Sequence, residues 1–116
     1  MTQLSQVAKI VQSLAPVDTN GAAKTHCPVH LKYYDHVTFL VLIGNIGGAI
    51  TLTVEKGATS SVGTAIAFNY RVASTGAAAK SVLDGALTAA TSAGITIAHA
   101  TQDNKVYAIE IDADEV

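Results

Sequence analysis

Tryptophan is absent from this chain, and its aromatic side chains are limited to two phenylalanines and four tyrosines among 116 residues. Charged residues are also scarce, at 14% of the chain, against the ~25% of ordinary globular domains. Hydrophobic residues nevertheless reach 49% and are mostly alanine, valine, isoleucine and leucine, so we expect a core of small branched side chains. A surface with so few charges suggests that another subunit covers part of it.

The chain also lacks an excess of positive charge, since its formal net charge is −2. With no basic patch and no aromatic residues interleaved among the cations, we expect no direct binding to nucleic acid or to anionic lipid. The single cysteine, Cys27, excludes an internal disulfide framework and is compatible with folding in a reducing cytosol. The N-terminal residues do not have the pattern of a signal peptide, and no apolar run approaches the ~20 residues that cross a bilayer.

A pair of strands joined by a glycine-bearing turn is predicted to organise the fold. Residues 37–43 are apolar on both faces, which predicts a strand covered on both sides. Residues 50–55 alternate between apolar and polar side chains, as in a strand with one buried face. The three glycines within 44–48 are expected to supply the positive-φ conformations of a hairpin turn. The core should therefore include Phe39, Val41, Ile50 and Leu52.

Further short strands are predicted from the same alternation and from the turn residues between them. They are expected over residues 29–34, 66–72, 86–88, 94–99 and 106–111, and the last two should form a closing hairpin around a turn at 101–104. Six or seven such strands favour an antiparallel β-sandwich or barrel-like fold over 29–112, within a single β-rich domain 1–116. The acidic residues after Ile111 are expected to be solvated.

Residues 1–15 are expected to form a short N-terminal helix or arm. Apolar residues follow the spacing of one helical face, and Pro16 prevents the helix from continuing. Because so short a helix is marginal alone in water, it should dock on the sheet or on a neighbouring subunit. The candidate partner-contact residues are Leu4, Val7 and Val11.

Several residues are candidates for catalysis or metal binding by their type. His26, His30 and His36 lie near Cys27 but lack the paired spacing of zinc ligands. Cys27 itself has no accompanying oxyanion-hole loop and no group to orient a base, so an inert thiol is the simpler interpretation. We expect no catalytic, metal or cofactor site here.

Two further patterns have structural explanations. The glycines of 44–48 precede a predicted strand, whereas a phosphate loop needs a Lys-Ser/Thr pair and a following helix. Asp112, Asp114 and Glu115 lack the glycine and the further oxygen ligands of a calcium loop. We therefore predict a non-enzymatic protein without a cofactor.

Four segments that together cover much of the chain resemble small structural proteins of tailed bacteriophages: 7–17, 31–39, 43–55 and 109–115. The resemblance implies a β-rich, head-associated protein without catalytic residues, that is, a capsid decoration (cement) or minor capsid protein. Its expected partners are the major capsid protein and copies of itself, with a trimer favoured at threefold positions of the shell. It would be assembled in the bacterial cytoplasm and lie on the capsid surface of the virion.

Two alternatives remain at this point. One is a structural protein of the tail or of the head–tail junction. The other is a small carbohydrate- or surface-binding β-sandwich module, although the chain has few aromatic residues to form a sugar platform. Related phage chains are expected to continue beyond the acidic segment near residue 115 with further strands, so a partner could complete the sheet here.

Overall fold

The structure is a computed structural model that describes residues 3, 23–24, 28–31, 34–59, 62–73, 83, 85–99 and 101–115. The chain divides into two compact units, residues 1–30 and 31–116, and the strands of the described residues all lie in the second. The described residues of the first unit have no regular secondary structure. The predicted N-terminal helix, with Leu4, Val7 and Val11, lies outside the described residues.

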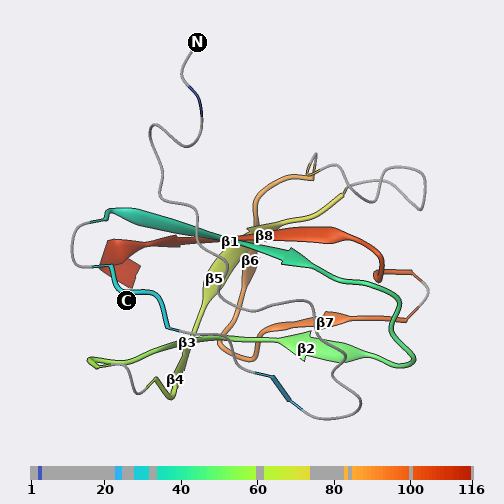
Figure 1. The fold of residues 1–116 in the computed structure, drawn as a ribbon, viewed down its shortest axis with the longest axis horizontal. Helices are drawn as coiled ribbons and strands as arrows, with labels where there is room; N and C mark the ends of the chain where they lie inside the picture. The colour runs from blue at the N-terminus through green and yellow to red at the C-terminus, as the bar shows by residue number, and fades with distance from the viewer. Residues whose placement is uncertain are drawn as a thin grey trace. The chain divides into compact units, whose positions relative to one another are not determined.

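Eight strands occur in the described residues, one or two more than predicted, and every pairing between them is antiparallel. A four-stranded sheet has the order β1-β8-β5-β6, while β2 pairs with β7 and β3 pairs with β4 (Figure 1). The prediction of a mainly β, antiparallel fold is confirmed. The elements are β1 (His36–Leu42), β2 (Ile50–Leu52), β3 (Val54–Lys56), β4 (Thr64–Ile66), β5 (Phe68–Arg71), β6 (Thr88–Ala90), β7 (Ile95–Ile97), β8 (Val106–Asp112) and the short 3-10 helix η2 (Ala113–Glu115).

Strand β8 is one of the two inner strands of the larger sheet. It pairs with β1 along its whole length, from His36 opposite Asp112 to Leu42 opposite Val106, and its other edge pairs with β5. Its side chains are buried at four of seven positions, including Ala108, which lies on the outer face between the two neighbouring strands. Consecutive buried residues from Tyr107 to Ile109 mean that both faces of the strand are covered there, which agrees with the apolar start of β8.

The core lies between the four-stranded sheet and the two smaller sheets. Its buried centre consists of Phe68, Ile109 and Ile111. The inner side chains of β1 pack against this cluster from one sheet, and residues of β2, β3, β4 and β7 pack against it from the others. Stacking of sheets around one apolar layer is the arrangement of a sandwich. The predicted core residues Phe39, Val41 and Leu52 pack against this cluster, and Ile50 is half-buried.

The predicted central hairpin is wrong. Strand β1 pairs with β8, and β2 pairs with β7, so residues 44–49 carry the chain from one sheet to another. The alternation over 50–55 is confirmed, because its apolar residues are half-buried and the others exposed. The expected positive φ values at 44–48 are also wrong, since among the described residues only Gly94 (φ 84°) and Asn104 (φ 53°) have them. Glycines permit a turn without dictating which strands pair, and long-range packing selected other partners.

The remaining strand predictions had mixed outcomes. A strand near 66–72 is confirmed, although it is interrupted at Ala67 and divided between β4 and β5. The closing hairpin is wrong, because β7 and β8 belong to different sheets and the turn after Ala98 connects them. The predicted strand over 29–34 is not formed at its described residues, which are 29–31 and 34.

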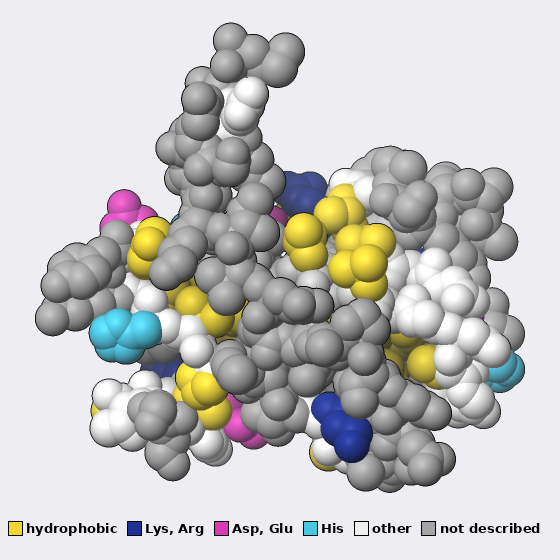
Figure 2. All heavy atoms as spheres, in the orientation of Figure 1, with side chains coloured by type: hydrophobic (Ala, Val, Ile, Leu, Met, Phe, Trp, Pro, Cys, Tyr) yellow, Lys and Arg dark blue, Asp and Glu magenta, His cyan; other side chains and the backbone are white. Residues whose placement is uncertain are grey.

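Strand β1 is not covered on both faces, contrary to the prediction. Its side chains alternate between exposed and half-buried along the whole strand. Leu40 and Leu42 expose 61% and 76% of their surface, which makes them the most exposed large apolar residues of the described chain. Figure 2 shows that, on one face of the molecule, apolar side chains reach the surface in several groups with few charged side chains visible among the described residues.

Candidate functional site

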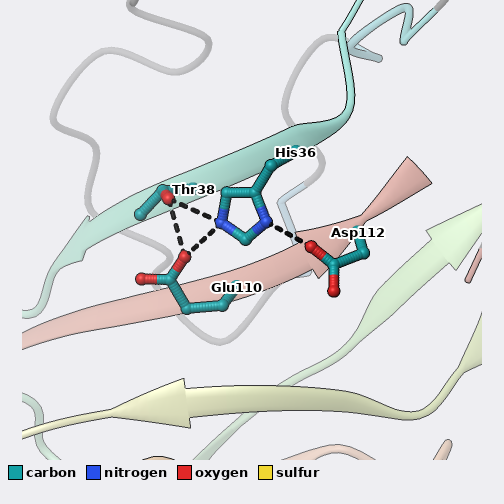
Figure 3. A network of polar contacts seen from close by, with 4 residues as sticks. All are labelled: His36, Thr38, Glu110 and Asp112. Atoms are coloured by element: carbon teal, nitrogen blue, oxygen red, sulfur yellow. Dashed lines mark hydrogen bonds and ion pairs between the residues drawn. The ribbon is translucent and has the colours of Figure 1, made fainter. Parts of the chain in front are cut away.

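A cluster of four polar side chains lies on the outer face of the β1–β8 pair, near the start of β1 (Figure 3). His36 and Thr38 come from β1, and Glu110 and Asp112 come from β8. The strand register places His36 opposite Asp112 and Thr38 opposite Glu110. Because side chains two apart in a strand share a face, all four project from the same side of the sheet.

The His36 ring lies between the two carboxylates. Its Nδ1 atom is 2.7 Å from Asp112 Oδ1, and its Nε2 atom is 2.5 Å from Glu110 Oε2. The Thr38 hydroxyl donates to the same Glu110 oxygen at 2.8 Å and lies 3.2 Å from His36 Nε2. This histidine clamp, defined as His36, Thr38, Glu110 and Asp112, links the two strands by side-chain contacts in addition to their backbone ladder.

The contacts determine the protonation of His36. The hydrogen bond to Asp112 and then that to Glu110 raise the pKa of His36 above its usual 6.5, while partial burial opposes the rise. An imidazolium ring donates from both nitrogens and therefore satisfies both carboxylates at once. The clamp is most complete when His36 is protonated.

The order Thr38, His36 and Asp112 resembles the hydroxyl, imidazole and carboxylate of a hydrolytic triad. In such a triad the Nε2 atom must be free to accept the hydroxyl proton. Here Glu110 accepts from Nε2 and also from the Thr38 hydroxyl. The geometry therefore directs both protons to Glu110 and does not activate Thr38.

The clamp is also unsuited to hold a metal ion. Its two carboxylates approach opposite nitrogens of the ring, whereas metal ligands must converge on one point. Within the described residues, no group of three or more His, Cys, Asp or Glu side chains could hold a metal. The chemistry that the cluster supports is charge pairing between strands.

The exposed face of β1 continues beyond the clamp as an apolar surface. We call the four exposed residues of this strand the outer row: His36, Thr38, Leu40 and Leu42. They share one face because they are spaced two apart. The row changes from polar at one end to aliphatic at the other, and its aliphatic half is largely exposed. The outer row thus combines a polar cluster and two exposed leucines on one face of the sheet.

A second polar group fixes the loops at the other end of β1 and β8. The side chain of Asp103 is almost fully buried and accepts a hydrogen bond from the backbone N–H of Ile46 at 3.3 Å. Its carboxylate also lies 3.5 Å from Nδ1 of His99. Nearby, the hydroxyl of Tyr107 donates to the backbone carbonyl of Gln102 at 2.8 Å. Burial is the main cause that raises the pKa of Tyr107. This group stabilises the connection between sheets.

The other candidates from the sequence do not form a site in the described residues. His26 and Cys27 lie outside them, and His30 is exposed and belongs to no strand. Asp112 pairs with His36, and Asp114 is exposed within η2. A hollow lined by Lys56, Gly57, Ala58 and Thr64 at the β3–β4 turn has one ionisable side chain. The described residues contain no helix long and apolar enough to cross a membrane.

The sequence indicates His36 and Asp112 only as members of two different candidate groups, far apart in the chain. The sequence does show two polar side chains two residues apart in each segment: His36 and Thr38 in one, and Glu110 and Asp112 in the other. These two pairs can be recognised as one cluster only when the register between β1 and β8 is known. The chain matches no model of a protein family, no curated protein and no solved structure.

Proposed function

We propose that this chain is a structural protein of a tailed-bacteriophage virion that binds the assembled capsid and stabilises it, as a decoration or cement protein. The phage context comes from the four segments that resemble small virion proteins. The observation that carries a contact role is the outer row of β1, where Leu40 and Leu42 are 61% and 76% exposed. Full burial of each leucine against a partner would contribute about 1.5–3 kcal/mol.

The proposed mechanism is attachment by a rigid framework. The backbone ladder between β1 and β8 and the histidine clamp hold the outer row in place, so little conformational entropy is lost when a partner covers it. Leu4, Val7 and Val11 of the N-terminal segment are proposed as additional contacts to the major capsid protein or to other copies of this chain. Many weak contacts repeated over a shell add avidity without a single strong site.

The proposal is tested by binding to capsids that lack this protein. We expect the purified chain to sediment with such particles and to raise the temperature at which they release DNA. A Leu42→Asp variant should bind at least tenfold more weakly, whereas Leu87→Asp, at an exposed leucine outside β1, should bind like the native chain. Deletion of residues 1–15 should preserve the β circular-dichroism signal and weaken binding.

Image reconstruction of intact particles supplies the decisive location. Density for this chain on the outside of the head supports the proposal. Density in the tail or at the head–tail junction would replace it with the alternative structural role. Absence from purified virions, combined with specific retention on a carbohydrate array, would favour the surface-binding module instead.

A further inference from the structure

The two ends of the β1–β8 pair are fastened by different means. At the end where β1 starts, the N–H of Ala113 donates to the carbonyl of Asp35 at 2.8 Å. The next pair inward is His36 opposite Asp112, whose side chains are in direct contact (Figure 3). The histidine clamp therefore lies beside the backbone bond that attaches η2 to the start of β1, and this end depends partly on an ionisable ring at the surface.

Backbone bonds close the other end of the same strand pair. The N–H of Ile43 donates to the carbonyl of Lys105 at 3.0 Å, and the N–H of Asn104 donates to the carbonyl of Gly44 at 3.1 Å. Peptide groups do not change charge in the pH range where a histidine does. The ring of His99 is described near this end but takes part in neither bond. We therefore expect these two bonds to be insensitive to pH.

Only a protonated ring fits the clamp as it stands. Both nitrogens of His36 lie within 2.7 Å of a carboxylate oxygen, Nδ1 beside Asp112 and Nε2 beside Glu110. A neutral imidazole has one N–H, so its other nitrogen would direct a lone pair at a carboxylate oxygen over the same short distance. Without a proton between them the two atoms repel, and one carboxylate has to move away. This follows from the two contacts, whichever tautomer the neutral ring adopts.

The other charges described at this end also favour the protonated ring. The further ionisable side chains described there are exposed and include no cation: Tyr34, Asp35 and Asp114. On the far side of β8, Asn69 of β5 lies opposite Glu110 and carries no charge. The hydrogen bonds to the two carboxylates raise the pKa of His36 above 6.5, so the ring loses its proton above that pH.

We infer that the histidine clamp is a pH-sensitive latch, which holds η2 and the end of β8 against the start of β1 while His36 is protonated and lets this end open when the ring becomes neutral. The opening stays local, because the next pair inward, Val37 opposite Ile111, packs in the apolar core and does not titrate. Since the clamp is exposed, loss of its contacts should favour opening by at most about fivefold. The latch goes beyond the proposed virion role and does not depend on it.

Two amides of the native chain test the latch, one at each end of the strand pair. The protection of the Ala113 and Ile43 amides is their NMR exchange rate relative to that of an unfolded amide at the same pH. Between about pH 6 and about pH 9, we expect protection of Ala113 to fall about two- to fivefold and that of Ile43 to stay constant. The fall should follow the loss of the His36 proton, observed in the ring resonances. A constant Ala113 protection while His36 titrates, or an equal fall at Ile43, would overturn the inference.

Variants of the ring separate its charge from its other contacts. His36→Gln cannot carry a charge, so its Ala113 amide should have the lower protection at every pH. His36→Lys keeps a cation up to about pH 9, so its Ala113 protection should no longer fall. His99→Gln, at the other end, should keep the native response. If Ala113 still loses protection with rising pH in His36→Gln, another group controls this end and the inference fails. All of these measurements use the chain without capsids, so they do not test the virion role.

Discussion

Gly94 passes so close to the backbone of Leu52 that a Cβ atom at this glycine would lie 2.1 Å from the Leu52 carbonyl oxygen. The same Cβ would lie 2.9 Å from the Thr53 methyl group. Gly94 also has a φ of 84°, which other residues rarely adopt. It lies just before β7, whose Ile95 is opposite Leu52 of β2. The pairing of these strands therefore depends on a missing side chain.

Gly94→Ala is expected to destabilise the fold strongly. The left-handed conformation alone costs an alanine about 1–2 kcal/mol, and the clash with a backbone oxygen forces β2 and β7 apart. We expect a loss of at least about 2 kcal/mol in the free energy of unfolding measured with urea. Gly63→Ala is the control, because a Cβ there has no atom within 4 Å. Equal stabilities of the two variants would show that β7 does not approach β2 this closely.

The two phenylalanines should respond differently to truncation. Phe68 is 3% exposed and belongs to the buried cluster, while Phe39 is half-buried and packs against that cluster from β1. Phe68→Ala should cost about 3–5 kcal/mol, as for a fully buried ring. Phe39→Ala should cost clearly less, because part of its surface is already in water. Thermal unfolding of both variants measures the difference. A larger loss of stability for Phe39→Ala would mean that the Phe39 ring is more deeply buried than Phe68.

Local patterns in the sequence predicted the strands well and their partners badly. The alternation of Ile50, Leu52 and Val54 with polar neighbours identified the buried face correctly, because a period of two follows from strand geometry alone. The apolar run of β1 predicts a strand covered on both sides, yet Leu40 and Leu42 are exposed. Apolar character does not tell whether a residue faces its own core or a surface that contacts another molecule.

The prediction of strand partners failed because pairing depends on contacts between residues that are distant in the sequence. The predicted hairpin joined β1 to β2 through the nearest turn, whereas β1 pairs with β8, some 70 residues later, as His36 opposite Asp112 shows. The candidate site depended on the same register. His36 and Glu110 come together only because β1 pairs with β8 in this register, and no local spacing encodes that pairing.

Asp103→Ala should loosen the connection between β1 and β8. The buried carboxylate accepts from the N–H of Ile46, and replacement leaves that donor without this acceptor. A lost buried hydrogen bond of this kind costs about 1–3 kcal/mol. Asp103→Asn keeps an acceptor of the same shape and should be less destabilising. Urea unfolding of both variants tests the order, and an alanine variant as stable as the native protein would show that the loop does not need this contact.

His36→Gln should destabilise the protein in a pH-dependent way. Because contacts with Asp112 and Glu110 raise the folded-state pKa of His36 above 6.5, the clamp contributes its full stability below about pH 6.5. That contribution is lost as pH rises through the raised folded pKa, since a neutral ring can donate to only one carboxylate. The clamp is exposed, so the expected difference from the native protein is at most about 1 kcal/mol at low pH.

The measurement is urea unfolding at about pH 5.5 and about pH 9, chosen to lie on either side of the titration. The difference in stability between the native protein and His36→Gln should be largest at the lower pH and shrink at the higher one. His30→Gln is the control, because His30 is exposed and belongs to no strand. A Glu110→Gln variant should lose part of the same pH dependence, because it removes one of the two charges that favour the imidazolium. A stability difference that does not change with pH would show that His36 is not held as an imidazolium between the two strands.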